Sequence, residues 1–326
     1  MSAVNHILLM PPNWIGDAVM AQPAMRAITD HYRAHQPSVR ISVCGRGWLQ
    51  ELLPWLNLPQ AAYADSIVKA DAAFLFPNSF RAAWQCRMAG NRHITGYRGQ
   101  WRRLLLSTAL KHRLSLRYQH HRDFYLDIPT SLGMEVTERH VRLTAPAGAI
   151  DNGREAMLAH GLDPQRVIAL APGAQFGAAK CYPEAGFASV CHTLAKAGWQ
   201  PLILGMPEDK ITGERILAGL HTAHWNAAGE TTLAQALELI AASQLMLCND
   251  SGLMHVAAGL GIPTVAPFGA TDPARTSPSG EHVRILFQPA ACSPCLQREC
   301  HVAGHPCMTN ITPQMLSDAC LDLLAA

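Results

Sequence analysis

The fold is decided by the stretch Leu247-Cys248-Asn249-Asp250-Ser251-Gly252-Leu253-Met254-His255, in which an apolar strand runs directly into small, polar residues and then into a helix. The helix is expected from about Leu253 to Leu260, because Gly261 and Pro263 would stop it. A second apolar strand, 263–268, follows at once. The pattern predicts a strand, helix, strand unit of a parallel sheet.

The start of this helix is a candidate anion site. Ser251 and Gly252 are small and leave room for a ligand. The first turn of a helix has unpaired backbone N–H groups and the positive end of the helix dipole, which together favour a phosphate. An ordinary helix cap is the alternative interpretation of the same residues.

The rest of the chain repeats the alternation of apolar strands and helical patterns. Strands are expected at 6–10, 39–44 and 72–76, then at 167–171, 201–205 and 245–248, with small and Pro/Gly-bearing residues between the two series at 143–150. This predicts an α/β fold with two Rossmann-like, doubly wound parallel sheets, residues 1–147 and 148–326, facing each other across a cleft. The last helix is a candidate to pack back on the first domain. In such sheets, ligands bind beyond the carboxyl ends of the strands.

Length and composition agree with a globular protein of the cytoplasm. The 326 residues suffice for two domains, and 49% of them are apolar, so a sizeable core can form. No apolar run approaches the roughly 18 to 20 residues that span a bilayer. The start of the chain also lacks the order of basic, apolar and small residues typical of a signal peptide.

The loop after the first strand, 11–20, brings a single carboxylate, Asp17, to the start of a helix. Asp17 is either an N-cap, worth roughly 1 kcal/mol, or a general base that accepts a proton from an incoming hydroxyl.

Loops of the second half offer further polar groups. In 171–180, small residues permit close approach of the backbone to a ligand, and Lys180 can place its charge on a phosphate or remain solvated. The loop lacks the Gly-Lys-Ser/Thr ending of a P-loop. Two more segments, 205–209 with Glu208 and 226–233 with Asn226, fit either a ligand site or ordinary turns.

A basic block covers 72–122, where there is no Asp or Glu and ten Lys or Arg. Such a block suits an anionic partner such as an acidic membrane surface or a phosphorylated or carboxylated sugar, with a solvated face as the alternative. Nucleic acid is disfavoured because no binding motif accompanies the block. The candidate anion-binding residues are Arg98, Arg102 and Arg103.

Four of the ten cysteines lie within sixteen residues near the end of the chain: Cys292, Cys295, Cys300 and Cys307. In a reducing compartment they are candidates for a structural zinc site or an iron–sulfur cluster, and free thiols are the alternative.

Four motifs occur in an order that resembles the ADP-heptose:lipopolysaccharide heptosyltransferases, over nearly the whole chain. They are Pro12-Asn13-Trp14-Ile15-Gly16-Asp17-Ala18-Val19-Met20, Ala171-Pro172-Gly173-Ala174 with Lys180, Asn226 with Gly229 and Leu233, and Asn249–His255. The resemblance implies the GT-B fold and an inverting transfer of heptose from a sugar nucleotide to the lipopolysaccharide inner core. It departs at Gln175-Phe176, where some relatives have two threonines or an acidic residue.

The resemblance also implies roles for individual residues. Asp17 is then the base, residues 1–147 carry the acceptor, and residues 148–326 bind the donor through Ala174, Gln175, Lys180, Glu208, Asn226, Asp250, Ser251, Gly252 and His255. Growing negative charge on the diphosphate would be met by Lys180 and the helix N-terminus. Asp250 could hold a sugar hydroxyl, order its loop or cap the helix. No cofactor is required for catalysis, and the protein would work at the inner membrane surface without spanning it. A relative with another donor or acceptor, or a silent sugar-nucleotide-binding protein, are the alternatives.

Overall fold

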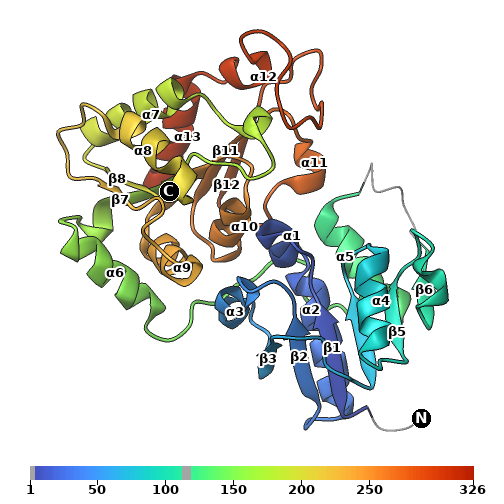
Figure 1. Cartoon of the computed structure of the whole chain (residues 1–326). Coiled ribbons are helices and arrows are strands. Elements are labelled where there is room, and N and C mark those ends of the chain that lie inside the picture. Colours follow the sequence, from blue (N-terminus) through green and yellow to red (C-terminus); the bar gives the residue numbers. More distant parts are fainter. Residues whose placement is uncertain (1–3, 112–118) are drawn as a thin grey trace. The chain divides into compact units, whose positions relative to one another are not determined.

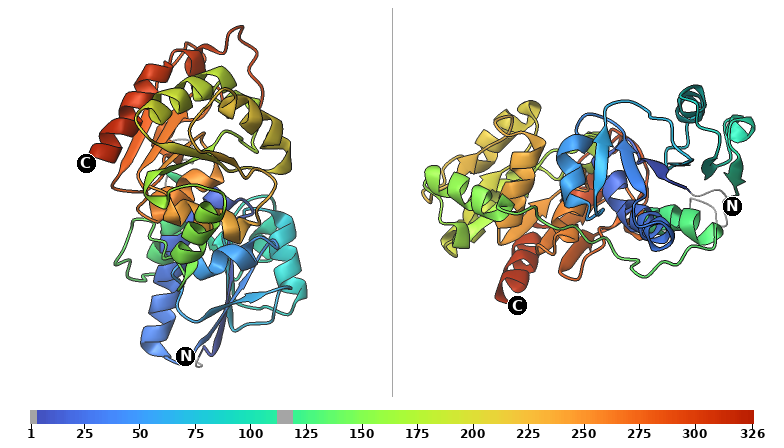
Figure 2. Two further views of the ribbon diagram at one scale, coloured as in Figure 1. Left: turned by 90° about the vertical axis from the view of Figure 1, so that its left-hand side faces the viewer. Right: turned by 90° about the horizontal axis from the view of Figure 1, so that it is seen from below.

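The computed structural model describes residues 4–111 and 119–326, which separate into two compact units, Met1–Thr144 and Ala145–Ala326. Each unit is a six-stranded parallel sheet with helices on both faces (Figures 1 and 2). The prediction of two doubly wound α/β units is confirmed. Of the basic block, Arg113 and Arg117 lie outside the described residues.

The sheet of the first unit has the strand order β3-β2-β1-β4-β5-β6. All its strand pairs are parallel. The strands are β1 His6–Met10, β2 Arg40–Cys44, β3 Ala61–Ala64, β4 Ala72–Leu75, β5 Ile94–Tyr97 and β6 Thr108–Leu110. The central strand β1 is buried along its whole length, as expected of a strand covered by helices on both faces.

The helices of this unit are α1 Ile15–Met20, α2 Gln22–His35, α3 Leu49–Leu52, α4 Phe80–Met88 and α5 His121–Ser131, with 3₁₀ turns η1 Leu53–Trp55 and η2 Arg102–Leu104. α5 packs against α1 and α2. α4 instead buries Ala82, Ala83 and Cys86 in a core formed with strand residues such as Leu8 and Leu75.

The sheet of the second unit has the order β12-β11-β10-β7-β8-β9. All its strand pairs are parallel too. The strands are β7 Val167–Ala171, β8 Gln200–Ile203, β9 Trp225–Asn226, β10 Leu245–Cys248, β11 Thr264–Phe268 and β12 Val283–Phe287. β7, β10 and β11 are buried at every position.

Two helical layers cover this sheet. α7, α8 and α13 share one core and α6, α9 and α10 the other, so residues alternate between the two layers along β7. α13 packs against α7 and the strands β10 to β12 (Figure 2). The helices are α6 Ala149–Ala159, α7 Glu184–Lys196, α8 Lys210–Leu217, α9 Leu233–Ala242, α10 Gly252–Gly259, α11 Pro273–Thr276, α12 Pro306–Thr309 and α13 Pro313–Ala325, with 3₁₀ turns η3 Pro164–Arg166, η4 Ala178–Lys180 and η5 Pro207–Asp209.

Strand order reverses once in each sheet. In the first unit β2 and β3 lie on one side of β1, while β4, β5 and β6 lie on the other. In the second unit the reversal lies between β7 and β10. Connections leave in opposite directions at such a point and open a crevice at the carboxyl ends of the two strands. Asp17 follows β1, Lys180 follows β7 and Asp250 follows β10, so all three lie beside a reversal.

Arg102 departs from its expected role as an acceptor ligand. Its side chain is completely buried, and its guanidinium donates to the carbonyls of Tyr97 at 2.5 Å, of Ser79 at 3.3 Å and of Pro77. Burial lowers the pKa of Arg102 to about 10, which leaves it charged at neutral pH. Arg102 therefore joins η2 to the ends of β4 and β5, whereas its neighbour Arg103 is exposed.

We expect Arg102→Met to lower the free energy of unfolding by about 2 to 4 kcal/mol, because several buried carbonyls lose a charged donor. Arg103→Met, at the neighbouring exposed position, should change it by less than about 0.5 kcal/mol. Urea unfolding would measure both, with hydrogen exchange over 94–110 to localise the effect. Equal stability of the two variants would contradict the structural role of Arg102.

Candidate active site

The loops after β7 and β10 meet in an ion pair between Lys180 and Asp250. The Lys180 Nζ lies 2.7 Å from the Asp250 Oδ2, and the two side chains are 13% and 4% exposed. Thr271, after β11, donates its hydroxyl to the same oxygen at 2.6 Å. The structure thus brings together two of the expected donor residues, and it adds Thr271, for which the local sequence carries no signal.

Asn249 fixes the two loops to each other. Its side-chain oxygen accepts from the backbone N–H of Tyr182 at 2.9 Å, and its amide donates to the Pro172 carbonyl at 2.5 Å. The Asn249 side chain therefore ties both ends of the 172–182 loop to the end of β10. Of the three roles open to Asp250, its contacts are those of loop ordering, since the N-cap of α10 is Ser251.

The start of α10 retains an unused hydrogen-bonding group. Ser251 has extended backbone and makes no side-chain cap bond to the helix. Its hydroxyl oxygen is buried and has no hydrogen-bond partner among the described residues. Gly252 opens the eight-residue helix and His255, one turn further on, is buried. A ligand oxygen at this position would satisfy the serine hydroxyl and the orphan N–H groups of the first turn.

The loop after β8 contributes a second carboxylate, Asp209, beside the expected Glu208. Asp209 accepts a hydrogen bond from the backbone N–H of Met206 at 2.9 Å, and its carboxylate lies so close to Gly173 and Gly205 that a Cβ at either glycine would collide with it. Burial raises the pKa of Asp209 above its usual range. The expected donor residue Glu208, beside it, is exposed.

The remaining expected donor residues are spread over neighbouring loops. Asn226 donates to the Lys210 carbonyl at 2.9 Å and accepts from the backbone N–H of Ala228 at 3.3 Å, so its side chain links β9 to α8. Ala174 is half-exposed and Gln175 is exposed on the Lys180 loop.

The segment that carries the four cysteines packs onto the Lys180 loop. The backbone N–H of Ala179 donates to the Arg298 carbonyl at 3.0 Å, and His305 Nε2 lies 3.1 Å from the Ala179 carbonyl. Two cations lie near the ring of Phe176: the Lys180 Nζ is 5.0 Å and the Arg298 guanidinium carbon 5.4 Å from its centroid. These contacts attach the Lys180 loop to the segment 298–305.

The four cysteines do not form the expected metal centre in the structure. Within the described ranges, no three side chains of the kinds that bind metals come together. Cys292 and Cys300 are exposed, whereas Cys307 belongs to the hydrophobic core beneath α13. Burial raises the pKa of the Cys307 thiol. The expected metal centre is therefore unsupported, and the structure has all four cysteines as free thiols.

The first unit places Asp17 beside two ring side chains of α5. The N-cap of α1 is Trp14, so Asp17 occupies the first turn rather than the cap. Its Oδ1 accepts the Tyr125 hydroxyl at 3.3 Å and lies 3.4 Å from His121 Nδ1. Both contacts involve one oxygen, and a quarter of the side chain stays exposed, so the carboxylate is oriented and still accessible. Burial, and then the Asp17 charge, raise the pKa of Tyr125 well above its ordinary value, which keeps it a donor.

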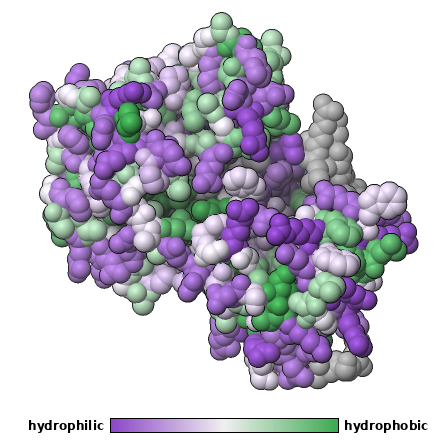
Figure 3. Space-filling model, in the orientation of Figure 1, coloured by the Kyte–Doolittle hydropathy of each residue, from purple (hydrophilic) through white to green (hydrophobic). Residues whose placement is uncertain are grey.

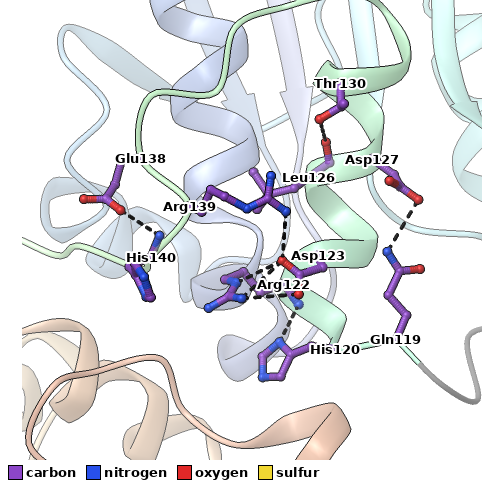
Figure 4. Close-up of polar contacts among 10 residues, drawn as sticks. All are labelled: Gln119, His120, Arg122, Asp123, Leu126, Asp127, Thr130, Glu138, Arg139 and His140. Atoms are coloured by element: carbon purple, nitrogen blue, oxygen red, sulfur yellow. Dashed lines mark hydrogen bonds and ion pairs between the residues drawn. The ribbon is translucent and has the colours of Figure 1, made fainter.

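Contacts at its N-terminus fix α5 in place (Figure 4). The N-cap His120 accepts from the backbone N–H of Arg122 at 3.1 Å. Asp123 is paired with Arg122 at 3.2 Å and with Arg139 at 3.3 Å. The Asp123–Arg139 pair links α5 to the segment that follows it, and Arg122, one member of the basic block, is partly neutralised. His121 and Tyr125 thereby approach Asp17 from a helix anchored on two sides.

The two arrangements suit two halves of a displacement reaction. An oriented, accessible carboxylate can accept a proton from a hydroxyl nucleophile. A lysine held beside a helix start with free donors can bind a diphosphate and stabilise the charge that develops on it as it leaves.

Comparison with known proteins agrees with this chemistry. A family model described as glycosyltransferase family 9 (heptosyltransferase) matches residues 66–305. Lipopolysaccharide heptosyltransferase 2 of Escherichia coli strain K12 is 31% identical, over 94% of this chain and 95% of that protein. The protein of the same name from Salmonella typhimurium strain LT2 is 30% identical, over 98% of each.

A solved structure shares the fold. The E. coli ADP-heptose lps heptosyltransferase II superposes with a TM-score of 0.80 at 29% identity, over 98% of each chain. The expected fold class, GT-B, is thereby confirmed.

We expect strong coupling between Lys180 and Asp250. Asp250→Asn should lower the free energy of unfolding by about 3 kcal/mol, because it leaves a nearly buried ammonium without its partner. Adding Lys180→Met should recover part of that loss, giving a coupling energy of about 1 to 3 kcal/mol in a double-mutant cycle measured by urea unfolding.

The matched control is the exposed pair Lys210–Glu230, which is 3.0 Å long with side chains 49% and 44% exposed. The same cycle there should give less than about 1 kcal/mol. Similar values for both pairs would contradict a structural role of the Lys180–Asp250 pair.

Proposed function

Because the chain belongs to glycosyltransferase family 9, the heptosyltransferase family, we propose that it transfers a heptose from ADP-L-glycero-D-manno-heptose to the inner core of lipopolysaccharide, as the second heptose. The observation that carries the proposal is 31% identity to lipopolysaccharide heptosyltransferase 2 over nearly the full length of both chains. The expectation of a glycosyltransferase is confirmed by the family match.

Transfer proceeds with inversion by direct displacement. The acceptor hydroxyl oxygen attacks the anomeric carbon, the bond from that carbon to the diphosphate breaks, and ADP leaves with the electron pair. The hydroxyl proton passes to Asp17, whose Oδ1 is held by Tyr125 and His121. General-base catalysis of this kind contributes about 100 to 10,000-fold in rate.

The donor diphosphate is assigned to the start of α10 and to Lys180. The ammonium has three donors and can contact a phosphate while it keeps the Asp250 bond. The unpaired Ser251 hydroxyl supplies a further donor at the helix start. Both groups face increasing negative charge as the glycosidic bond breaks, so they act most strongly in the transition state. No step needs a metal or another cofactor.

Two exposed arginines that follow β5 are assigned to the acceptor. Arg98 follows β5 directly, and Arg103 belongs to η2. Inner-core lipopolysaccharide carries carboxylates and phosphates, which arginine binds in a bidentate manner. Arg102, being buried, is not part of this set.

The acceptor is anchored in lipid, so the enzyme must work at a membrane surface, and we place it at the cytoplasmic face of the inner membrane. In residues 4–111 and 119–326, no helix combines the length and the apolarity that crossing a bilayer requires. Attachment in this proposal is peripheral.

The proposal predicts transfer of a heptose-sized mass from ADP-heptose to a de-acylated core acceptor, read by mass spectrometry against a panel of other sugar nucleotides. Asp17→Asn should slow turnover by about 100 to 10,000-fold without changing donor affinity, because the base acts on the acceptor. Lys180→Ala should lower both turnover and donor affinity, because the lysine charge would contact the diphosphate in the ground state and in the transition state.

Three results would contradict this scheme in different ways. Transfer from another sugar nucleotide only would make the chain a family relative of different specificity. Donor binding with no transfer to any acceptor would make it a silent binding protein. Near-wild-type turnover of Asp17→Asn would remove Asp17 from catalysis.

Acceptor binding should depend on salt more strongly than donor binding. Exposed charges are screened over about 8 Å in physiological salt and over less at higher ionic strength. Acceptor KM should therefore rise with salt more steeply than donor KM, and Arg98→Gln with Arg103→Gln should raise it in low salt. The control is Arg154→Gln with Arg215→Gln, at exposed positions of the second unit. An acceptor KM that changes neither with salt nor with either pair of arginine substitutions would assign the acceptor to another surface.

A further inference from the structure

The outward face of α4 carries the large side chains of that helix. The residues it buries are small: Ala82, Ala83 and Cys86. Phe80, Trp84 and Met88 follow one another at helical spacing and are 42%, 49% and 67% exposed. The rings of Phe80 and Trp84 stack with centroids 6.3 Å apart. A surface helix ordinarily turns its large apolar residues towards the core, so α4 is amphipathic in the reverse sense.

The turn η2 extends this apolar surface. Trp101 and Leu104 are 89% and 88% exposed. The turn lies against the start of α4, because the Gln100 side chain accepts from the Phe80 backbone N–H at 3.2 Å and the buried Arg102 bonds the Ser79 carbonyl.

Trp101 combines an exposed side chain with an unfavourable backbone conformation. Trp101 has φ +62°, in the left-handed region that residues other than glycine seldom adopt. The conformation is unfavourable, and the indole gains almost no burial within the chain. The turn holds an aromatic ring out towards solvent.

Basic side chains frame these apolar ones. Arg81 and Arg87 on α4 are exposed, and the sequence has no Asp or Glu between Asp71 and Asp123. In Figure 3, apolar green side chains interrupt the hydrophilic purple surface of the first unit. Large exposed apolar groups combined with charge of one sign are what an anionic bilayer surface binds: aromatic rings settle among the headgroups while arginine pairs with phosphate.

We propose that an anionic lipid bilayer docks on this α4–η2 surface, defined as Phe80, Arg81, Trp84, Arg87, Met88, Trp101 and Leu104. The inference rests on the proposed function, in which the acceptor is embedded in a membrane. α4 begins after β4 and η2 follows β5, so both start at the carboxyl edge of the sheet. Asp17, after β1, lies at the same edge of this parallel sheet. Docking there brings the lipid surface to the edge of the unit that carries the base.

The test is flotation of the full chain with vesicles of phosphatidylethanolamine containing about one third phosphatidylglycerol, against vesicles of phosphatidylcholine alone. Wild type should partition at least about tenfold more strongly into the anionic vesicles. Arg81→Gln with Arg87→Gln should lower partition by about fivefold for each charge removed. Trp101→Ser with Leu104→Ser should lower it by about tenfold or more, whereas Trp101→Phe with Leu104→Ile should retain it.

The matched control is Leu158→Ser with Ile211→Ser, which removes side chains 61% and 60% exposed on the second unit and should leave partition unchanged. Activity separates this proposal from the function itself. The Trp101/Leu104 serine variant should transfer heptose to de-acylated acceptor at the wild-type rate and lose activity only on acceptor embedded in vesicles.

Failure of wild type to act on the de-acylated acceptor would refute the proposed function. Activity on that acceptor with no vesicle binding, or with binding indifferent to the α4–η2 substitutions, would overturn the docking surface alone. Self-association that the Trp101/Leu104 serine variant abolishes, without any vesicle binding, would assign the surface to a second copy of the chain.

Discussion

Parallel strands impose the constraint on which the rest of this structure depends. A parallel pair cannot be closed by a tight turn, so every connection crosses over the sheet and each strand ends at the same edge. Where the order reverses, beside β1 and between β7 and β10, the connections part and leave their loops free to bind a ligand. Asp17, Lys180 and Asp250 all follow strands at these reversals. The residue types in these loops then determine the chemistry that is available at each sheet edge.

The Lys180–Asp250 pair explains how a flexible side chain can serve an anion site. A lysine loses about 2 kcal/mol of rotamer entropy when it is fixed, and here much of that ordering occurs before any ligand arrives, through Asp250 and the Phe176 ring. A carboxylate alone would repel a diphosphate, but an ammonium that is already paired with Asp250 would attract the diphosphate in the proposed donor complex. Thr271 donates to the Asp250 oxygen that the lysine also contacts, which helps to fix the position of that carboxylate.

Local sequence was sufficient for the strands beside the reversals and for the loops after them, because buried parallel strands are near-continuous apolar runs. It was insufficient for the partly exposed edge strands β3 and β12. The helix after β1 starts at Ile15, so Asp17 lies inside its first turn and is not the N-cap.

Long-range partners leave no local signal either. His121 and Tyr125 reach Asp17 across 104 and 108 residues. Nor does composition tell a buried arginine from an exposed one, so Arg102 looked like a ligand. The cysteine spacing suggested a metal site, yet it could not show that Cys307 enters the core.

The contacts that support Asp17 and those that support the α4–η2 surface belong to one framework in the first unit. Tyr125, which donates to Asp17, packs edge-on against Phe76 at the end of β4, with centroids 6.0 Å apart. Its neighbour Phe124 stacks on Tyr97 of β5 at 4.4 Å and accepts the Tyr97 hydroxyl at 2.6 Å. Arg102 donates a hydrogen bond to the Tyr97 carbonyl, and this contact ties η2 to β5. Because these contacts are buried while Trp101 and Leu104 are exposed, substitutions on the α4–η2 surface should leave the Asp17 carboxylate in place.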